Sequence, residues 1–329
     1  MRIEEKGFSL PLILLAFLAL VNYLSFVAPH ECNRNRPVIF NFGDSNSDTG
    51  GFVAGVGIEY GYPYGRAFFR RPTGRTSDGR LVIDFLCEYL STHYLSPYLN
   101  SLEPDFTNGA NFAIAGATTL PKYVPFSLGS FGSLSYAQVI ERIPSFISEI
   151  KDAMWAIYEL GGRNFWVHNT GPLGCLPREL ALRSNGNASD YDEYGCMRSL
   201  NEGAKAFNAK LEALSQELRS QMENSTIVYV DVYSIKYDLM ANSTYYGFKN
   251  PLMACCGYGG APYNYNPNRT CLDSGHTVCE EETRYINWDG VHYSEAAAAI
   301  VASKILSTHY SSPHLQFNFF CNTATFSSS

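Results

Sequence analysis

Two kinds of apolar pattern alternate along the chain. Short, nearly continuous apolar runs have the pattern of strands buried on both faces, and they occur at residues 38–42, 165–167 and 227–232. Longer segments repeat apolar residues at every third or fourth position, as helices do, and they occur at residues 81–90, 141–160, 200–222 and 294–306. Helices that alternate with all-apolar strands predict an α/β fold, in which helices cover both faces of a parallel sheet.

The start of the chain has a different pattern. Residues 8–28 are almost entirely apolar and follow a short segment with two basic side chains. The run is long enough to span a bilayer, but Pro11 and Asn22 interrupt it and no basic cluster follows. We therefore predict a signal peptide over 1–28 and a secreted protein, extracellular or in the cell wall, with no stable membrane anchor. Residues 29–329 would form the mature domain.

Export changes how the cysteines are interpreted. All nine cysteines lie beyond residue 28, where an oxidising compartment favours disulfides. The number is odd, and Cys87, on the apolar side of a helical pattern, is the predicted free thiol; the pairing of the others stays open. No cysteine or histidine spacing is typical of zinc, so we expect no metal site. Four sequons predict glycosylation, at Asn187, Asn224, Asn242 and Asn268.

Composition and charge narrow the class of function. The chain of 329 residues has an apolar content of 46%, which excludes a disordered or collagen-like protein. Its formal charge of −7 argues against a nucleic-acid partner, because such proteins need a basic face. The glycine-rich nucleotide motifs and the HExxH motif are missing from the sequence, so we expect no cofactor.

A serine and a histidine are the candidates for chemistry. Ser45 follows the first predicted strand, at the sheet edge where α/β proteins place their sites. A serine hydroxyl needs a neighbouring base. Among the seven histidines, His292 has a carboxylate, Asp289, three residues earlier in a turn-like sequence. This spacing suggests a Ser–His–Asp triad. The alternative is that His292 only precedes the last helix and Ser45 caps a turn.

Three sequence blocks resemble a known family. GDSNSDTGG (43–51), NGANFAIAGA (108–117) and WDGVHY (288–293) are similar to blocks of the GDSL, or SGNH, hydrolases. The plant GDSL esterase/lipases, and their early-nodulin-like branch in particular, are the most similar group, and the resemblance covers residues from about 37 to 310. It implies a flavodoxin-like, three-layer fold with a parallel sheet, and ester hydrolysis through an acyl-serine.

The resemblance also implies roles for particular residues. Ser45 would be the nucleophile, His292 the general base and then the general acid, and Asp289 the group that orients the histidine. The backbone N–H groups of Ser45 and Gly109 would donate to the oxyanion. Relatives hydrolyse acetylated sugars, lipid esters and phenolic esters, so a small-molecule or polysaccharide ester is the expected substrate. Some members of the branch are described as fucosidases, but a glycosidase usually needs two carboxylates and only Asp289 is placed by a motif.

One block of the family is missing. Relatives carry a strand and a GxND loop between segments that resemble 126–138 and 139–150, but here these two segments are contiguous. We therefore predict an internal deletion near 138–139, a sheet that lacks one central strand, and an oxyanion hole without its asparagine. Loss of such a donor lowers kcat by about 10² to 10³. The alternatives are a catalytically inactive secreted glycoprotein that binds glycan or acyl ligands, and a chain that is no stable product.

Overall fold

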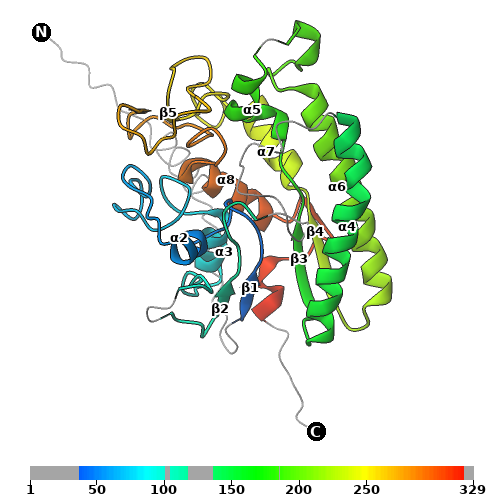
Figure 1. Cartoon of the computed structure of the whole chain (residues 1–329). Coiled ribbons are helices and arrows are strands. Elements are labelled where there is room, and N and C mark those ends of the chain that lie inside the picture. Colours follow the sequence, from blue (N-terminus) through cyan, green and yellow to red (C-terminus); the bar gives the residue numbers. More distant parts are fainter. Residues whose placement is uncertain (1–36, 101–103, 118–135, 185, 322–329) are drawn as a thin grey trace, which may run out of the picture.

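The computed structural model describes residues 37–100, 104–117, 136–184 and 186–321, and Figure 1 shows the whole chain. The predicted signal peptide lies outside the described residues. The strands are β1 (Ile39–Asn41), β2 (Gly109–Asn111), β3 (Asn164–His168), β4 (Thr226–Val230), β5 (Cys256–Gly257), β6 (Thr277–Val278) and β7 (Ser311–Ser312). The α-helices are α2 (Gly51–Val56), α3 (Val82–Tyr89), α4 (Tyr136–Glu159), α5 (Pro177–Leu182), α6 (Arg198–Gln221), α7 (Val232–Ala241) and α8 (Glu295–Leu306), and the short 3₁₀ helices are η2 (Leu173–Cys175), η3 (Ala188–Asp190) and η4 (Phe317–Cys321).

The strands form separate sheets. β1 pairs with β2 in parallel, β3 pairs with β4 in parallel, and β7 joins the other edge of β4 in the antiparallel direction. The α/β class is therefore confirmed. The expectation of one parallel sheet is wrong for the described residues, because β1–β2 and β3–β4–β7 form separate sheets and β7 is antiparallel.

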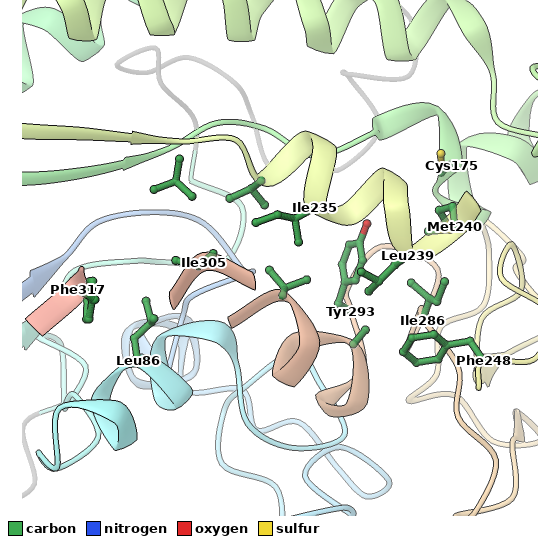
Figure 2. Close-up of a cluster of buried hydrophobic side chains, with 14 of the residues drawn as sticks. Leu86, Cys175, Ile235, Leu239, Met240, Phe248, Ile286, Tyr293, Ile305 and Phe317 are labelled. Atoms are coloured by element: carbon green, nitrogen blue, oxygen red, sulfur yellow. The ribbon is translucent and has the colours of Figure 1, made fainter. Parts of the chain in front are cut away.

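The β3–β4 sheet has a helical layer on each face. Side chains alternate along β4, so Ile227 and Tyr229 pack with α4 and α6, while Val228 and Val230 face the opposite core. That second core contains side chains of α3, α7 and α8, and Figure 2 shows Leu86, Ile235 and Ile305 within it. In Figure 1, α4 and α6 lie side by side over one face of this sheet.

The helices follow the predicted periodicity, with ends set by local chemistry. Helix α8 begins after Ser294, whose hydroxyl accepts a hydrogen bond from the Ala297 N–H, and Asp78 accepts from the Glu295 N–H. The predicted helix over 141–160 starts earlier than expected, and α4 continues through Pro144. It ends before Gly161, which has a φ of +101°.

The first predicted strand is buried on one face only. Ile39 packs against the core, but Phe40 and Phe42 are 60% and 57% exposed. Phe42 stacks on Phe112 with ring centroids 5.1 Å apart. The continuous apolar run at 38–42 therefore does not correspond to a strand covered on both faces. The apolar residues on the second face form an exposed aromatic surface instead.

Disulfides brace the loops of the C-terminal half. Cys175 bonds to Cys196, and two further bonds, Cys255–Cys279 and Cys256–Cys271, hold the long loop around β5 and β6. Among the described cysteines Cys87 is the free thiol, as predicted, and it is fully buried. Cys321 is also disulfide-bonded. None of the described helices is long and apolar enough to cross a bilayer.

Candidate active site

The turn that carries Ser45 follows β1 and is held by polar contacts. The Asp44 carboxylate accepts a hydrogen bond from the Asn46 N–H at 2.8 Å. The Thr76 hydroxyl donates to the Ser45 carbonyl oxygen, also at 2.8 Å. Both contacts fix the backbone on either side of the Ser45 side chain. A sharp turn directly after a strand places that side chain beyond the carboxyl end of the strand, where α/β sheets hold their sites.

The structure brings the three predicted triad residues together. The Ser45 Oγ lies 2.8 Å from His292 Nε2, although 247 positions separate the two residues in sequence. On the other side of the imidazole, Nδ1 lies 2.6 Å from Asp289 Oδ2. The remaining carboxylate oxygen, Oδ1, accepts the backbone N–H groups of Val291 and His292. The ring therefore has its Nδ1–H directed at the carboxylate and its Nε2 free to accept the serine proton.

Electrostatics favour an imidazolium next to a carboxylate. Burial opposes the charged form of Asp289, but the His292 charge and the hydrogen bonds that the carboxylate accepts outweigh it, so the pKa of Asp289 is lowered. Burial also opposes the charging of His292, but the adjacent Asp289 charge outweighs it, so the pKa of His292 is raised. A histidine of this kind holds the proton taken from a serine without a large energetic cost.

The structure adds Tyr64, a contact that the sequence reasoning missed. Its hydroxyl donates to Asp289 Oδ2 at 3.0 Å. The Tyr64 ring is buried and meets Trp288 edge to face, with centroids 5.7 Å apart. The Arg66 guanidinium lies 5.2 Å from the centre of the Trp288 ring. No spacing in the sequence signals this contact, because Tyr64 and Asp289 are 225 positions apart.

The block at 108–117 is tied to the Ser45 turn by buried amides. Asn111 donates to the Ser47 carbonyl at 2.7 Å and accepts from the Asn41 side chain at 2.8 Å. The Asp48 carboxylate accepts from the N–H of Ala115 at 2.8 Å as well as from the start of α2. These contacts explain why asparagine and aspartate stand at those positions within two of the matching blocks.

The structure corrects the expectation for Gly109. This residue lies in β2 opposite Ile39, and its N–H donates to the Phe106 carbonyl at 3.1 Å. A Cβ at Gly109 would come within 1.9 Å of the Ile39 carbonyl oxygen, so close strand packing accounts for the glycine. The N–H that does reach the Ser45 turn belongs to Ile114, which donates to the Gly43 carbonyl.

The four sequon asparagines, Asn187, Asn224, Asn242 and Asn268, are all exposed. No group of three or more His, Cys, Asp or Glu side chains in the described part of the chain is arranged to hold a metal ion.

Comparison with known proteins agrees with this geometry. The profile of a family described as GDSL-like lipase/acylhydrolase matches residues 39–127 and 127–305, in two pieces. The chain is 51% identical to GDSL esterase/lipase LIP-4 of Arabidopsis thaliana, over 87% of this chain and 90% of that protein. That alignment has 337 positions but contains only 87% of 329 residues, so about fifty aligned positions have no residue of this chain.

More distant relatives have other names. GDSL esterase/lipase ENOD8 of Medicago truncatula is 36% identical, over 96% of this chain and 97% of that protein. A protein named Alpha-L-fucosidase 3, from Arabidopsis thaliana, is 38% identical, over 89% of this chain and 96% of its own length. With the profile match over most of the chain, these similarities establish that the protein belongs to the GDSL-like lipase/acylhydrolase family of carboxylic ester hydrolases.

Proposed function

We propose that this protein is a secreted serine esterase that hydrolyses carboxylic esters through an acyl-serine intermediate. The observation that carries the proposal is the unbroken series of contacts from Asp289 through His292 to Ser45, with distances of 2.6 and 2.8 Å. The 2.8 Å contact lies within the range at which a base takes the proton of a nucleophile, and the 2.6 Å contact is the hydrogen bond by which a carboxylate orients that base.

Acylation proceeds from this geometry. The Ser45 Oγ attacks the ester carbonyl carbon while its proton moves to His292 Nε2, and the carbonyl π electrons move to the oxygen. Asp289 stabilises the imidazolium that forms. When the tetrahedral intermediate collapses, the alcohol leaves with the proton from Nε2 and the acyl group stays on Ser45. In deacylation, a water molecule takes the place of the serine hydroxyl in the same steps, and Ser45 regains its proton as the acid is released.

Backbone N–H groups stabilise the oxyanion in this proposal. The Ser45 N–H makes no hydrogen bond with another described residue, so it is free to donate to the reacting carbonyl. In the described segment after Ile114, Ala115 and Ala117 already donate to Asp48 and Ile114, so the Gly116 N–H is the second donor in this proposal. Gly109 has no such role, because its N–H donates to the Phe106 carbonyl just before β2. Oxyanion donors of this kind contribute about 10² to 10³ each in kcat.

The chain also lacks the family's third block in this proposal. Two findings support it: the match to the family profile breaks at residue 127, and about fifty aligned positions of a close relative have no counterpart here. A third is the pair of edge strands, β1 and β3, since a strand between them would pair with both. The deletion, near 138–139 within the domain at 29–329, removes the asparagine donor and uncovers one face of β1. In this proposal the enzyme has a lower kcat than its relatives, but it retains the contacts among Ser45, His292 and Asp289.

The proposed deletion is tested by inserting the missing block into the chain. Insertion of the missing block from the 51% identical relative should raise kcat on p-nitrophenyl acetate by about 10² or more and raise the melting temperature. Sequencing the transcript across the Gln138–Val139 junction separates a true isoform from a gene-model error. A chain that elutes only as an aggregate, with no cooperative melting, would favour the alternative that it is not a stable product.

Secretion and glycosylation are part of the proposal. The apolar stretch at 8–28, the disulfides and the exposed sequons all suit an oxidising route. Expression of the full chain in a plant secretory system should yield a medium-borne protein that lacks residues 1–28. Its apparent mass in a denaturing gel should fall stepwise as each sequon asparagine is changed to Gln. Retention in the cell with uncleaved residues 1–28 would contradict secretion.

The substrate is a small-molecule or polysaccharide ester rather than a glycosidic bond. The relative named as a fucosidase raises the second candidate. A glycosidase usually needs a pair of carboxylates across the bond that it cleaves. Asp289 is already occupied by His292, Tyr64 and two backbone N–H groups, so its carboxylate is engaged in orienting the imidazole.

The test of the function is covalent labelling of the nucleophile. A fluorophosphonate probe should label the wild type at Ser45, and Ser45→Ala should lose both the label and p-nitrophenyl acetate hydrolysis. Ser220→Ala, an exposed serine on α6, is the control and should match the wild type. If the wild type hydrolyses the ester no faster than Ser45→Ala and takes no label, the protein is the inactive, ligand-binding glycoprotein instead.

A further inference from the structure

A lysine outside the three blocks described above lies over the ring of the residue that follows His292. Lys236 is on α7, and its Nζ sits 4.0 Å from the centre of the Tyr293 ring, the residue after His292. Its side-chain stem lies against Gly171 in the loop after β3, where a Cβ would come 2.9 Å from Lys236 Cδ. Figure 2 shows Tyr293 between the start of α8 and α7. The geometry therefore places a cation where three elements meet beside the catalytic histidine.

This cation forms no ion pair with a described residue. Among the described residues, no carboxylate lies within 4.0 Å of the Lys236 ammonium, and no hydrogen bond satisfies it. The charged and titratable groups that face it are Asp44 from the Ser45 turn, His168 at the end of β3, and His292 before α8. Two of the three are at the catalytic centre. A half-buried ammonium without an acceptor favours the arrival of negative charge at that centre.

We propose that Lys236 is a further catalytic residue, whose ammonium stabilises the negative charge that develops on the ester carbonyl oxygen during attack by Ser45. The inference rests on the esterase function proposed above. It assigns to a side chain of α7 the electrostatic role that the lost GxND asparagine would otherwise fill. A lysine aimed at developing charge stabilises the transition state more than the neutral ester, which raises kcat rather than substrate affinity.

Two pH effects follow from the same position. Burial lowers the pKa of Lys236 to about 8, although Asp44 opposes part of the shift. The catalytic cation is therefore lost as the pH rises through about 8, which gives kcat a descending limb there. The Lys236 charge also lowers the pKa of His292, so its removal should raise that pKa and move the ascending limb to higher pH.

The experiment compares three forms of the full chain, namely wild type, Lys236→Met and Lys236→Arg, in p-nitrophenyl acetate hydrolysis between about pH 5 and 10. Lys236→Met should lower kcat by about 10² with little change in KM, lose the descending limb and shift the ascending limb upward. Lys236→Arg should recover part of kcat and keep its activity above pH 8, because a guanidinium stays protonated. Lys205→Met, which removes a lysine over the ring of Tyr233, is the matched control and should match wild type.

The outcomes separate this inference from the function on which it rests. If Lys236→Met keeps kcat within about threefold of wild type, or if kcat falls equally in both variants while neither limb moves, Lys236 has no catalytic role. In either case Ser45 labelling continues and the esterase proposal stands. If the wild type itself shows no Ser45-dependent hydrolysis, the esterase proposal fails first. Melting temperatures of all variants show whether a loss of activity is a loss of folding.

Discussion

The hydroxyl of Tyr64 donates to the same oxygen of Asp289 that accepts from the His292 ring. A residue near the start of the described chain thereby stabilises the carboxylate that orients the imidazole. The contact is internal to the domain, because the Tyr64 ring is only 6% exposed. In the proposed mechanism Tyr64 is a positioning residue, because it would act on the reaction through Asp289.

Replacement of Tyr64 with Phe should therefore lower kcat by about tenfold and leave KM nearly unchanged. Loss of the donated hydrogen bond leaves more negative charge on Asp289, so the pKa of His292 should rise and the ascending limb of kcat should move to higher pH. The stability loss should be about 1 kcal/mol, measured by urea unfolding. Tyr245→Phe, at a tyrosine that is 79% exposed, is the control. If the pH dependence of kcat is the same in Tyr64→Phe and the wild type, Tyr64 contributes only packing.

Replacement of Asp289 with Asn should shift the pH profile in the opposite direction. The Asp289 charge raises the pKa of His292 against the effect of burial. Without this charge burial dominates, so the pKa of His292 should fall and the ascending limb should move to lower pH. The maximum kcat should fall by about 10⁴, because the ring loses its orientation and its counter-charge. If the ascending limb of kcat stays at the wild-type pH in this variant, another carboxylate determines the pKa of His292.

The buried pair of Arg75 and Asp84 should dominate stability near the site. Arg75 makes two hydrogen bonds to Asp84, of 2.8 and 2.7 Å, and the carboxylate is fully buried. Arg75→Met leaves that charge uncompensated and should cost about 3–5 kcal/mol in chemical denaturation. Arg70 forms an exposed pair with Glu281, so Arg70→Met should cost less than about 1 kcal/mol. Equal costs for the two variants would contradict this account.

Cys87 should be inert in the native protein. Its thiol is fully buried, and burial raises its pKa to about 12. A thiol reagent at neutral pH reacts with the thiolate, so Cys87 should stay unmodified until denaturant is added, when peptide mapping should find the label on it. Cys87→Ser provides the blank. Rapid modification under native conditions would mean that the surrounding helix α3 opens readily.

The amino-acid sequence alone predicted the helices and the three residues that the structure brings together at the candidate site. Apolar side chains repeat with a period near that of a helix turn, and this local pattern matched α3, α6 and α8 within a few residues. The loop of Asp289 and His292 was predictable for the same reason, because both groups come from one short segment. Cys87 followed from its place on the apolar side of a helix.

Only the tertiary structure shows which residues pack against each helix, strand and loop. The apolar run at 38–42 could not show that its second face is uncovered, because strand burial depends on neighbours distant in sequence. Gly109 matched a block, yet its N–H is used within its own strand region. Tyr64 contacts Asp289 from the turn before α3, and Lys236 of α7 lies over the ring of Tyr293, the residue after His292. Periodicity records which face of a segment is apolar, whereas the packing of the whole chain determines which residues meet there.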